Sequence, residues 1–266
     1  MLFKRVVTVL IGAPFVIGAI LAPTTWVFKS FVLLCLLFAL NEFFGIVSLS
    51  RGQKITAVLL GGFHIAFLLF CSDRERWQLL ESCLVILAVF IYYCVAPKES
   101  SEGLGPRIAL TLLGVLYIGT FGALIGLLRD HSFGVFWIFA LLGMTWMNDT
   151  LAYFFGHRFG KHKLAPKISP GKTVEGFFGG TLGTLCGFFL FWLICPNDLP
   201  VWKGLILTAL VGIFGPVGDL CESLIKRSFH VKDSGNIIPG HGGMLDRIDA
   251  LLFTAPVVYF FATFVG

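Results

Sequence analysis

Long runs of apolar residues alternate with short polar segments along the whole chain of 266 residues. A helix needs about 20 residues to cross the hydrocarbon core of a bilayer, and nine of the runs are near that length. No run shows sustained alternation of polar and apolar positions, so a β-barrel is not expected. Because the bilayer core holds no water, the backbone N–H and C=O groups must bond within the segment, and helices meet that need. The nine runs cover approximately residues 6–22, 26–48, 55–71, 79–95, 108–128, 133–155, 174–195, 201–218 and 250–265.

The composition supports this interpretation. Hydrophobic residues make up 57% of the chain, charged residues only 13%, and the mean hydropathy is +0.89. A soluble domain carries about 25% charged residues, because its surface must be solvated. We therefore expect an all-α, polytopic integral membrane protein with about nine transmembrane helices. The first run resembles a signal peptide, but Ile20 would occupy the −3 position before Ala22, which disfavours cleavage and favours a retained helix.

The basic residues predict the orientation. With a cytoplasmic amino terminus, fifteen of the 20 Lys and Arg residues fall in cytoplasmic segments, as the positive-inside rule requires. They are spread over separate loops next to apolar helices, so anionic lipid or an anionic substrate is a more natural partner than nucleic acid. We expect a bacterial cytoplasmic (inner) membrane protein whose active site faces the cytoplasm.

Two long polar connections divide the chain by function. We expect residues 1–132 to form a helical scaffold with a candidate dimer contact, and residues 133–266 to form a catalytic region. The catalytic region contains two cytoplasmic loops, 156–173 and 219–249, and loops carry function more often than the scaffold does. The first loop carries Arg158, Lys161, His162, Lys163, Lys167 and Lys172 and no acidic residue.

Acidic residues inside or beside the apolar runs are the strongest chemical signal, because a charge in a membrane span is costly. Six such acids lie in the cytoplasmic half on the predicted topology: Glu42, Asp149, Asp219, Glu222, Asp246 and Asp249. Carboxylates in this number suit Mg²⁺, which is held by one or two of them together with substrate phosphates. We expect these acids to gather at one depth.

Spacing strengthens this expectation around the second loop. If the eighth helix continues past residue 218, Asp219, Glu222, Ser223 and Lys226 share one of its faces. Asp246 and Asp249 share a face if the last helix begins there. A plainer interpretation is also open: the two aspartates would favour a helix amino end, and Glu222 would pair with Lys226.

Cations and glycines fill the segment between these helices. It contains Lys226-Arg227, Lys232-Asp233-Ser234-Gly235 and Pro239-Gly240-His241-Gly242-Gly243. Glycines let backbone N–H groups approach an anion, and Lys and Arg neutralise phosphate. His241 is either a hydrogen-bonding or a proton-transfer residue.

These residues carry a family resemblance. The 27-residue segment from Ser223 to Asp249, with its Lys232-Asp233-Ser234-Gly235 and Pro239-Gly240-His241-Gly242-Gly243-Met244-Leu245-Asp246-Arg247 runs, resembles the signature of phosphatidate cytidylyltransferases, also called CDP-diacylglycerol synthases. The segments 148–153 and 156–176 are similar to the same family. The amino-terminal half resembles it only in hydropathy and in Asn41-Glu42-Phe43.

The resemblance implies that CTP and phosphatidate react to give CDP-diacylglycerol and pyrophosphate, with Mg²⁺ required, a second metal ion left open, and a homodimer as the working form. The residue assignments below are hypotheses that join this reaction to the residue chemistry. Metal binding is assigned to Asp219, Asp246 and Asp249, supported from nearby by Asp149, Glu222 and Asp233. Binding of the CTP phosphates or of pyrophosphate is assigned to Lys226, Arg227, Lys232 and Arg247. Further substrate contacts are assigned to Ser169, Lys172, Thr173, Ser223, His241, Gly242 and Gly243.

Three other functions fit parts of the sequence. A secondary transporter also carries intramembrane acids, but its site tends to lie near the bilayer midplane between internal repeats, and no repeat is visible here. A phosphotransferase that consumes a CDP-lipid would need a compact run of aspartates on consecutive helical turns, which we do not find. A structural scaffold would leave the charged loops unexplained.

Overall fold

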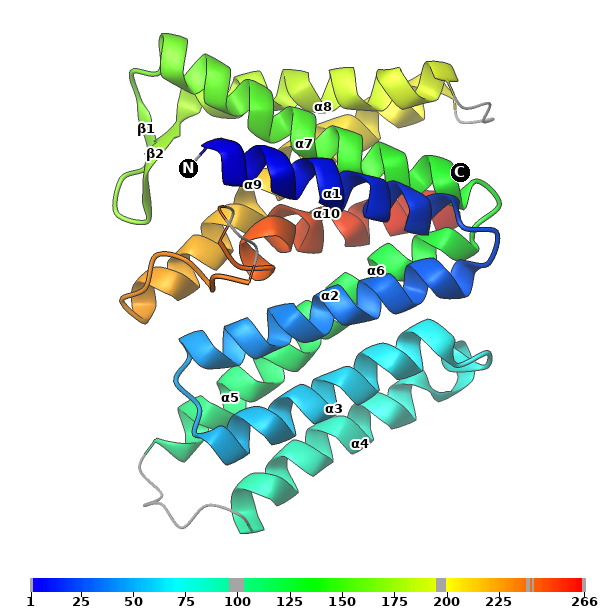
Figure 1. Cartoon of the computed structure of the whole chain (residues 1–266), viewed down its shortest axis with the longest axis vertical. Coiled ribbons are helices and arrows are strands. Elements are labelled where there is room, and N and C mark those ends of the chain that lie inside the picture. Colours follow the sequence, from blue (N-terminus) through cyan, green and yellow to red (C-terminus); the bar gives the residue numbers. More distant parts are fainter. Residues whose placement is uncertain (1, 96–102, 195–199, 238–239, 241, 265–266) are drawn as a thin grey trace. The chain divides into compact units, whose positions relative to one another are not determined.

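The computed structural model describes residues 2–95, 103–194, 200–237, 240 and 242–264. Within these ranges the chain is helical apart from short connections and one small hairpin (Figure 1). Each of the nine predicted apolar runs lies on a helical segment. Eight of the described helices are long and apolar enough to cross a membrane, and the first helix contributes a shorter apolar segment, Gly12–Leu21. The predicted class, an all-α polytopic integral membrane protein, is confirmed.

The chain forms two compact units, and the division differs from the predicted one at residue 132. Unit 1 comprises Met1–Gly126 and Asp233–Asp246, and unit 2 comprises Leu127–Lys232 and Arg247–Gly266. Residues 233–246, which sequence analysis placed in the second loop, therefore belong with the amino-terminal helices. Whether the predicted scaffold and catalytic regions are separate in function stays a prediction.

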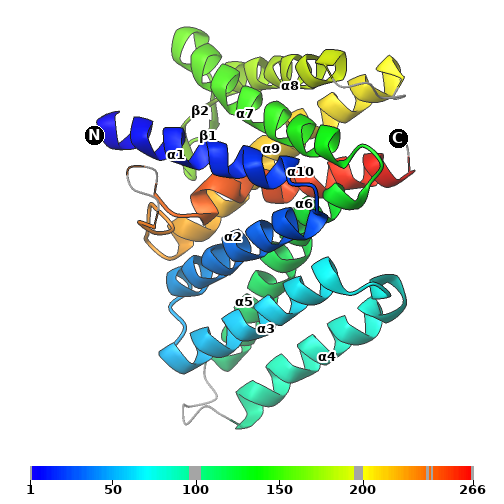
Figure 2. The ribbon, with the colours of Figure 1, turned by 45° about the vertical axis from the view of Figure 1, so that its right-hand side comes forward.

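Unit 1 is built from α1 (Leu2–Leu21), α2 (Thr25–Ile46), α3 (Arg51–Phe70), α4 (Arg74–Val95), α5 (Leu104–Gly114) and α6 (Gly122–Leu127), which ends at the border with unit 2. A π-helix, Val115–Phe121, joins α5 to α6. Helix α3 packs against α2, α4 and the π-helix, as Figure 2 shows for the first two. Ser50 starts α3 with a capping box, in which its hydroxyl accepts from Gln53 N and Gln53 Oε1 accepts from Ser50 N.

Two buried side chains and one half-buried side chain connect these helices. Both oxygens of Glu81 in α4 lie within 3.1 Å of His64 Nδ1 in α3, and His64 Nε2 lies 2.9 Å from Thr120 Oγ1 in the π-helix. His64 and Glu81 are buried, so each needs the partner that the other supplies. This network connects α3, α4 and the π-helix through directional bonds.

Unit 2 contains α7 (Gly134–Phe159), the strands β1 (Lys163–Ala165) and β2 (Ser169–Thr173), α8 (Val174–Ile194), α9 (Val201–Ser228) and most of α10 (Leu245–Phe264). The strands form an antiparallel hairpin in the loop predicted at 156–173. Helices α7 and α8 run closely together because glycines face the neighbouring backbone: a Cβ on Gly183 or Gly187 would collide with the carbonyl oxygen of Met147 or Gly143. Small residues at four-residue spacing are typical of such contacts in membranes.

Large apolar side chains are exposed along several of these helices. Phe15, Leu79 and Leu193 are each more than 70% exposed, with values of 72%, 79% and 75%. Isolated apolar residues are normal on any surface, but contiguous exposed apolar surface indicates contact with lipid or another protein. The exposed surface agrees with the spans assigned by length and composition.

Candidate active site

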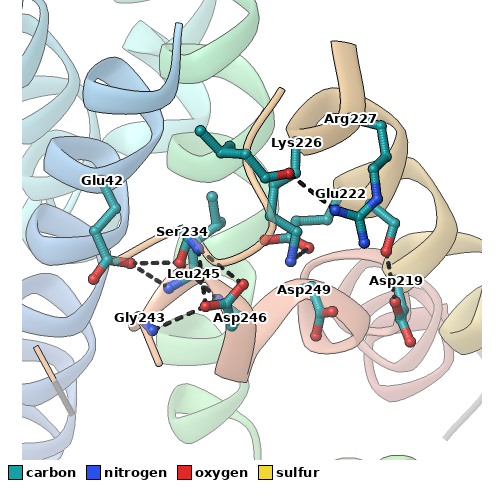
Figure 3. Close-up of polar contacts among 12 residues, drawn as sticks. Glu42, Asp219, Glu222, Lys226, Arg227, Ser234, Gly243, Leu245, Asp246 and Asp249 are labelled. Atoms are coloured by element: carbon teal, nitrogen blue, oxygen red, sulfur yellow. Dashed lines mark hydrogen bonds and ion pairs between the residues drawn. The ribbon is translucent and has the colours of Figure 1, made fainter. Parts of the chain in front are cut away.

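The polar end of α9 gathers the first group of predicted site residues. The helix continues to Ser228, ten residues past the predicted end of the apolar run, so the condition for a shared face is met. Ser223 Oγ donates to Asp219 Oδ1 over 3.3 Å. One turn further, Lys226 Nζ lies 2.5 Å from Glu222 Oε2, and both side chains are buried (Figure 3). The ion pair that the plainer interpretation anticipated is present.

Lys172 joins the hairpin to α9. Its side chain leaves β2, and Nζ lies 2.7 Å from Asp219 Oδ2 and 3.3 Å from the carbonyl oxygen of Pro216. The Lys172 side chain is 22% exposed and that of Asp219 is 35% exposed. The pair is therefore reachable from solvent but shielded enough for the charges to interact more strongly than at an open surface.

Helix α10 adds a further carboxylate within unit 2. Asp249 is close enough to interact electrostatically with Asp219, Glu222 and Asp149, and Figure 3 shows Asp219 and Asp249 side by side. Gly218 permits this approach, because a Cβ at that position would come within 2.8 Å of the Asp249 carbonyl oxygen. Three helices therefore direct four carboxylates to one region.

Positive charge balances this region. Asp149 in α7 interacts electrostatically with Asp219 and with two cations, Lys172 and Arg247. Like charges destabilise one another at short range in a partly desolvated environment, so the cations are needed to hold the acids together. In such an arrangement the acids can bind a divalent ion and the cations can bind the phosphate groups of the ligand that accompanies it.

A second polar group lies in unit 1. Glu42 in α2 is 5% exposed, and its Oε2 accepts from Ser234 Oγ over 3.0 Å and from Leu245 N over 2.8 Å. Asp246 accepts from Ser234 N over 3.0 Å and from Gly243 N over 2.9 Å. Figure 3 shows these bonds as one connected network. Sequence analysis noted Glu42 as an acid in a span but gave it no role at the site.

The other predicted site residues occupy more peripheral positions. Arg227 donates from Nη1 to the Val231 carbonyl oxygen, and Lys232, Asp233 and Arg247 are exposed. Thr173 is buried, and its Oγ1 accepts from Gly176 N in the first turn of α8. Ser169 is half-buried in β2.

Three predicted substrate-binding positions, His241, Gly242 and Gly243, belong to the glycine-rich segment, and Gly243 donates its N–H to Asp246. Gly242 has φ +86°, a conformation that side-chain-bearing residues rarely adopt. His241, also predicted to bind substrate, lies outside the described residues.

Carboxylates of unit 2 are the candidate ligands for a metal ion. Among them, no three His, Cys, Asp or Glu side chains form a ready-made cage. Mg²⁺ does not require one, because it is usually bound through one or two carboxylates and completes its shell with water and substrate phosphates. The hard carboxylate oxygens of Asp219 and Asp249 match that preference, so the donor chemistry of unit 2 fits this ion.

Fold and site together define an integral membrane protein with an acidic and basic polar region where its helices end, suited to a phosphorylated ligand. Comparison with known proteins is more specific. The family model described as the cytidylyltransferase family matches residues 3–265, and the chain belongs to that family.

Several curated relatives carry one name, phosphatidate cytidylyltransferase. The protein of Staphylococcus saprophyticus is 36% identical over 203 residues, which are 75% of this chain and 76% of the relative. That of Bacillus subtilis is 40% identical over 182 residues, 68% of this chain and 67% of the relative. That of Staphylococcus haemolyticus is 39% identical over 182 residues, 67% of each chain. The family expected from the signature is confirmed.

Proposed function

We propose that the chain is a phosphatidate cytidylyltransferase, which converts CTP and phosphatidate into CDP-diacylglycerol and pyrophosphate in phospholipid biosynthesis. The observation that carries this proposal is the family match over residues 3–265 together with relatives of that name at 36–40% identity. The charged region of unit 2 supports it independently, since both substrates are phosphate anions.

The chemistry places modest demands on acid–base groups. An oxygen of the phosphatidate phosphate attacks the α-phosphorus of CTP, a new P–O–P bond forms, and the bond to the β-phosphate oxygen breaks with its electron pair leaving on pyrophosphate. The nucleophile is already an anion, so a strong base is unnecessary. What the protein must supply is alignment of two anions and stabilisation of the charge that spreads in the transition state.

Residues of unit 2 are suited to these tasks. Lys172 and Lys226 are cations held beside carboxylates, and each can exchange its carboxylate partner for a phosphate oxygen. Arg247 is exposed and interacts electrostatically with Asp149. We assign Mg²⁺ to Asp219 and Asp249 of unit 2. The metal role of Asp246, which belongs to unit 1, stays a prediction from the sequence. When bound, Mg²⁺ supplies positive charge that neutralises the triphosphate and polarises its phosphorus.

The remaining features of the proposal concern location and assembly. The distribution of Lys and Arg supports a cytoplasmic amino terminus and cytoplasmic loops in a bacterial inner membrane. The acyl chains of phosphatidate would then stay in the bilayer while its headgroup reacts at the inner surface. The homodimer is proposed from the family resemblance, and cross-linking in membranes tests it.

One assay tests the proposed reaction directly. The purified full-length protein is incubated in detergent micelles with Mg²⁺, phosphatidate and CTP labelled in the cytosine ring, and the lipid phase is extracted. We expect a labelled CDP-lipid and an equal amount of pyrophosphate. Diacylglycerol, which lacks the attacking phosphate, should give no product. Folded protein that gives no labelled lipid would overturn the proposal.

A further inference from the structure

Glu42 is far from the signature in sequence but is bonded to it in unit 1. It comes from α2, and its hydrogen bond to Ser234 joins residues 192 positions apart. The carboxylate lies in a tight space between glycines, where a Cβ on Gly235 would approach Oε1 to 2.5 Å. An acid enclosed in this way is costly in an apolar helix unless its partners compensate, so the contacts are informative.

Each contact of Glu42 acts on the start of α10. Leu245 is the first residue of that helix, and its N–H is one of the donors that a helix leaves without an internal acceptor. Glu42 Oε2 accepts this N–H over 2.8 Å, and its negative charge is favourable at a helix amino end. The bond therefore fixes where α10 begins.

Ser234 extends the effect to the next side chain. Its hydroxyl donates to Glu42, while its backbone N–H donates to Asp246 over 3.0 Å. Asp246 N in turn donates to Ser234 Oγ over 3.3 Å. Glu42 thus holds Asp246 through two routes, the backbone of Leu245 and the side chain of Ser234.

We infer that Glu42 is a positioning residue for the reaction, which sets the start of α10 and, through Ser234, the orientation of the Asp246 carboxylate. The inference rests on the proposed function. Among the described residues the hydrogen bonds of Glu42 go to Ser234 and Leu245, so we assign it a positioning role rather than a catalytic one. Its loss would misplace Asp246 by a small distance, and displacements of about 1 Å can cost about 100-fold in rate.

A buried glutamate that only stabilises the fold should affect the amount of folded protein and not its turnover. Glu81 provides the matched control, because it is also a buried glutamate of unit 1 with a hydrogen-bonded partner, but its partner is His64 rather than the signature segment. Removing Glu81 should reduce the amount of folded protein and leave the turnover of each folded molecule unchanged. Removing Glu42 should lower turnover itself.

The test measures kcat and KM for CTP per folded molecule in Glu42→Ala, Glu42→Gln, Ser234→Ala, the double variant Glu42→Ala/Ser234→Ala, and Glu81→Gln. We expect Glu42→Ala to lower kcat by about 30- to 100-fold with KM for CTP changed less than threefold, on the scale of a misplaced catalytic group. Glu42→Gln keeps an acceptor oxygen and should recover kcat to within about fivefold of the wild type. The double variant should be no more than about twofold slower than Glu42→Ala, because Glu42→Ala already removes the acceptor that orients the Ser234 hydroxyl.

Hydrogen exchange gives a readout that does not depend on turnover. The Leu245 and Ser234 amides should exchange faster in Glu42→Ala than in the wild type and should be unchanged in Glu81→Gln. If Glu42→Ala does not fold, Glu42→Gln and Ser234→Ala carry the same comparison.

The outcomes separate the two proposals. A wild type without turnover overturns the proposed reaction and this role with it. An active wild type whose Glu42→Ala variant keeps its kcat, or whose Glu42→Gln variant is as slow as Glu42→Ala, overturns the positioning role alone.

Discussion

Lys172 Nζ lies 2.7 Å from Asp219 Oδ2, so a lysine from the β-hairpin and an aspartate from α9 form one ion pair. The two residues are 47 positions apart and belong to the two segments that sequence analysis named as functional loops. The contact places a cation that can bind phosphate directly beside an acid that can bind a metal ion. The hairpin and the carboxyl-terminal part of α9 therefore contribute to one polar region of unit 2.

Loss of the lysine charge should impair turnover. Lys172→Met removes one charge-assisted contact to a phosphate, worth about 2–3 kcal/mol, which corresponds to roughly 30- to 150-fold in kcat/KM. Lys167→Met is the matched control, because Lys167 lies on the same hairpin connection and is exposed. Steady-state kinetics with CTP and phosphatidate measure both variants. A Lys172→Met enzyme as active as the control would show that this lysine does not bind substrate.

The acids at the site should be needed for chemistry and not for folding. Asp219→Asn, Asp246→Asn and Asp249→Asn are nearly isosteric, so we expect each protein to insert and purify normally while turnover falls by at least about 1000-fold, as for loss of a charge-stabilising group. Asp73→Asn, an exposed acid between α3 and α4, should remain fully active. Product formation per folded molecule decides the matter, and near-normal activity in a purified site variant would count against the metal assignment.

The effects of replacing Glu222 and Lys226 on the free energy of unfolding should not be additive. Removing one partner of a buried ion pair leaves an uncompensated charge and costs about 3–5 kcal/mol. Lys226→Met should therefore lower the unfolding temperature in detergent, whereas the double variant Glu222→Leu/Lys226→Met should recover much of the loss. If the double variant were as unstable as both single losses combined, the pair would not be acting as a unit.

Close packing of α7 against α8 should make Gly183 intolerant of even a methyl group. In Gly183→Ala the new Cβ would collide with the Met147 carbonyl oxygen, and overpacking of this kind costs about 1–3 kcal/mol. Gly105→Ala in α5 is the control, because a Cβ there meets no atom within 4 Å and alanine favours a helix. Thermal unfolding of the two variants should move in opposite directions. Equal stability of Gly183→Ala and the wild type would contradict the observed helix contact.

Hydropathy was sufficient to predict the helices but not their polar ends. The nine apolar runs match helical segments because a spanning helix must be apolar over most of its length. Hydropathy did not show whether α9 continues from residue 219 to Ser228, because that part of the helix is polar. The shared face of Asp219 and Glu222 could therefore be predicted only if the helix continued. The hairpin of β1 and β2 was described as a loop because strands of three and five residues are too short to show a period.

The acids illustrate the same limit at the site. The cost of burying a charge singled out six acids in or beside the spans. The structure brings four of them, Asp149, Asp219, Glu222 and Asp249 of unit 2, into electrostatic contact. The role of Glu42 was beyond sequence reasoning because it depends on a tertiary bond to Ser234. The available signals were the cost of an acid in a span and the family resemblance of Asn41-Glu42-Phe43, and neither identifies a partner.

The most direct measurement compares labelled CDP-lipid formed from CTP and phosphatidate by the wild-type protein and by Asp219→Asn, each normalised to folded protein in the same Mg²⁺ buffer. The account predicts a phosphatidate-dependent product for the wild type and none above background for the variant. Equal product from the two proteins would contradict the assignment of the polar end of α9 to catalysis.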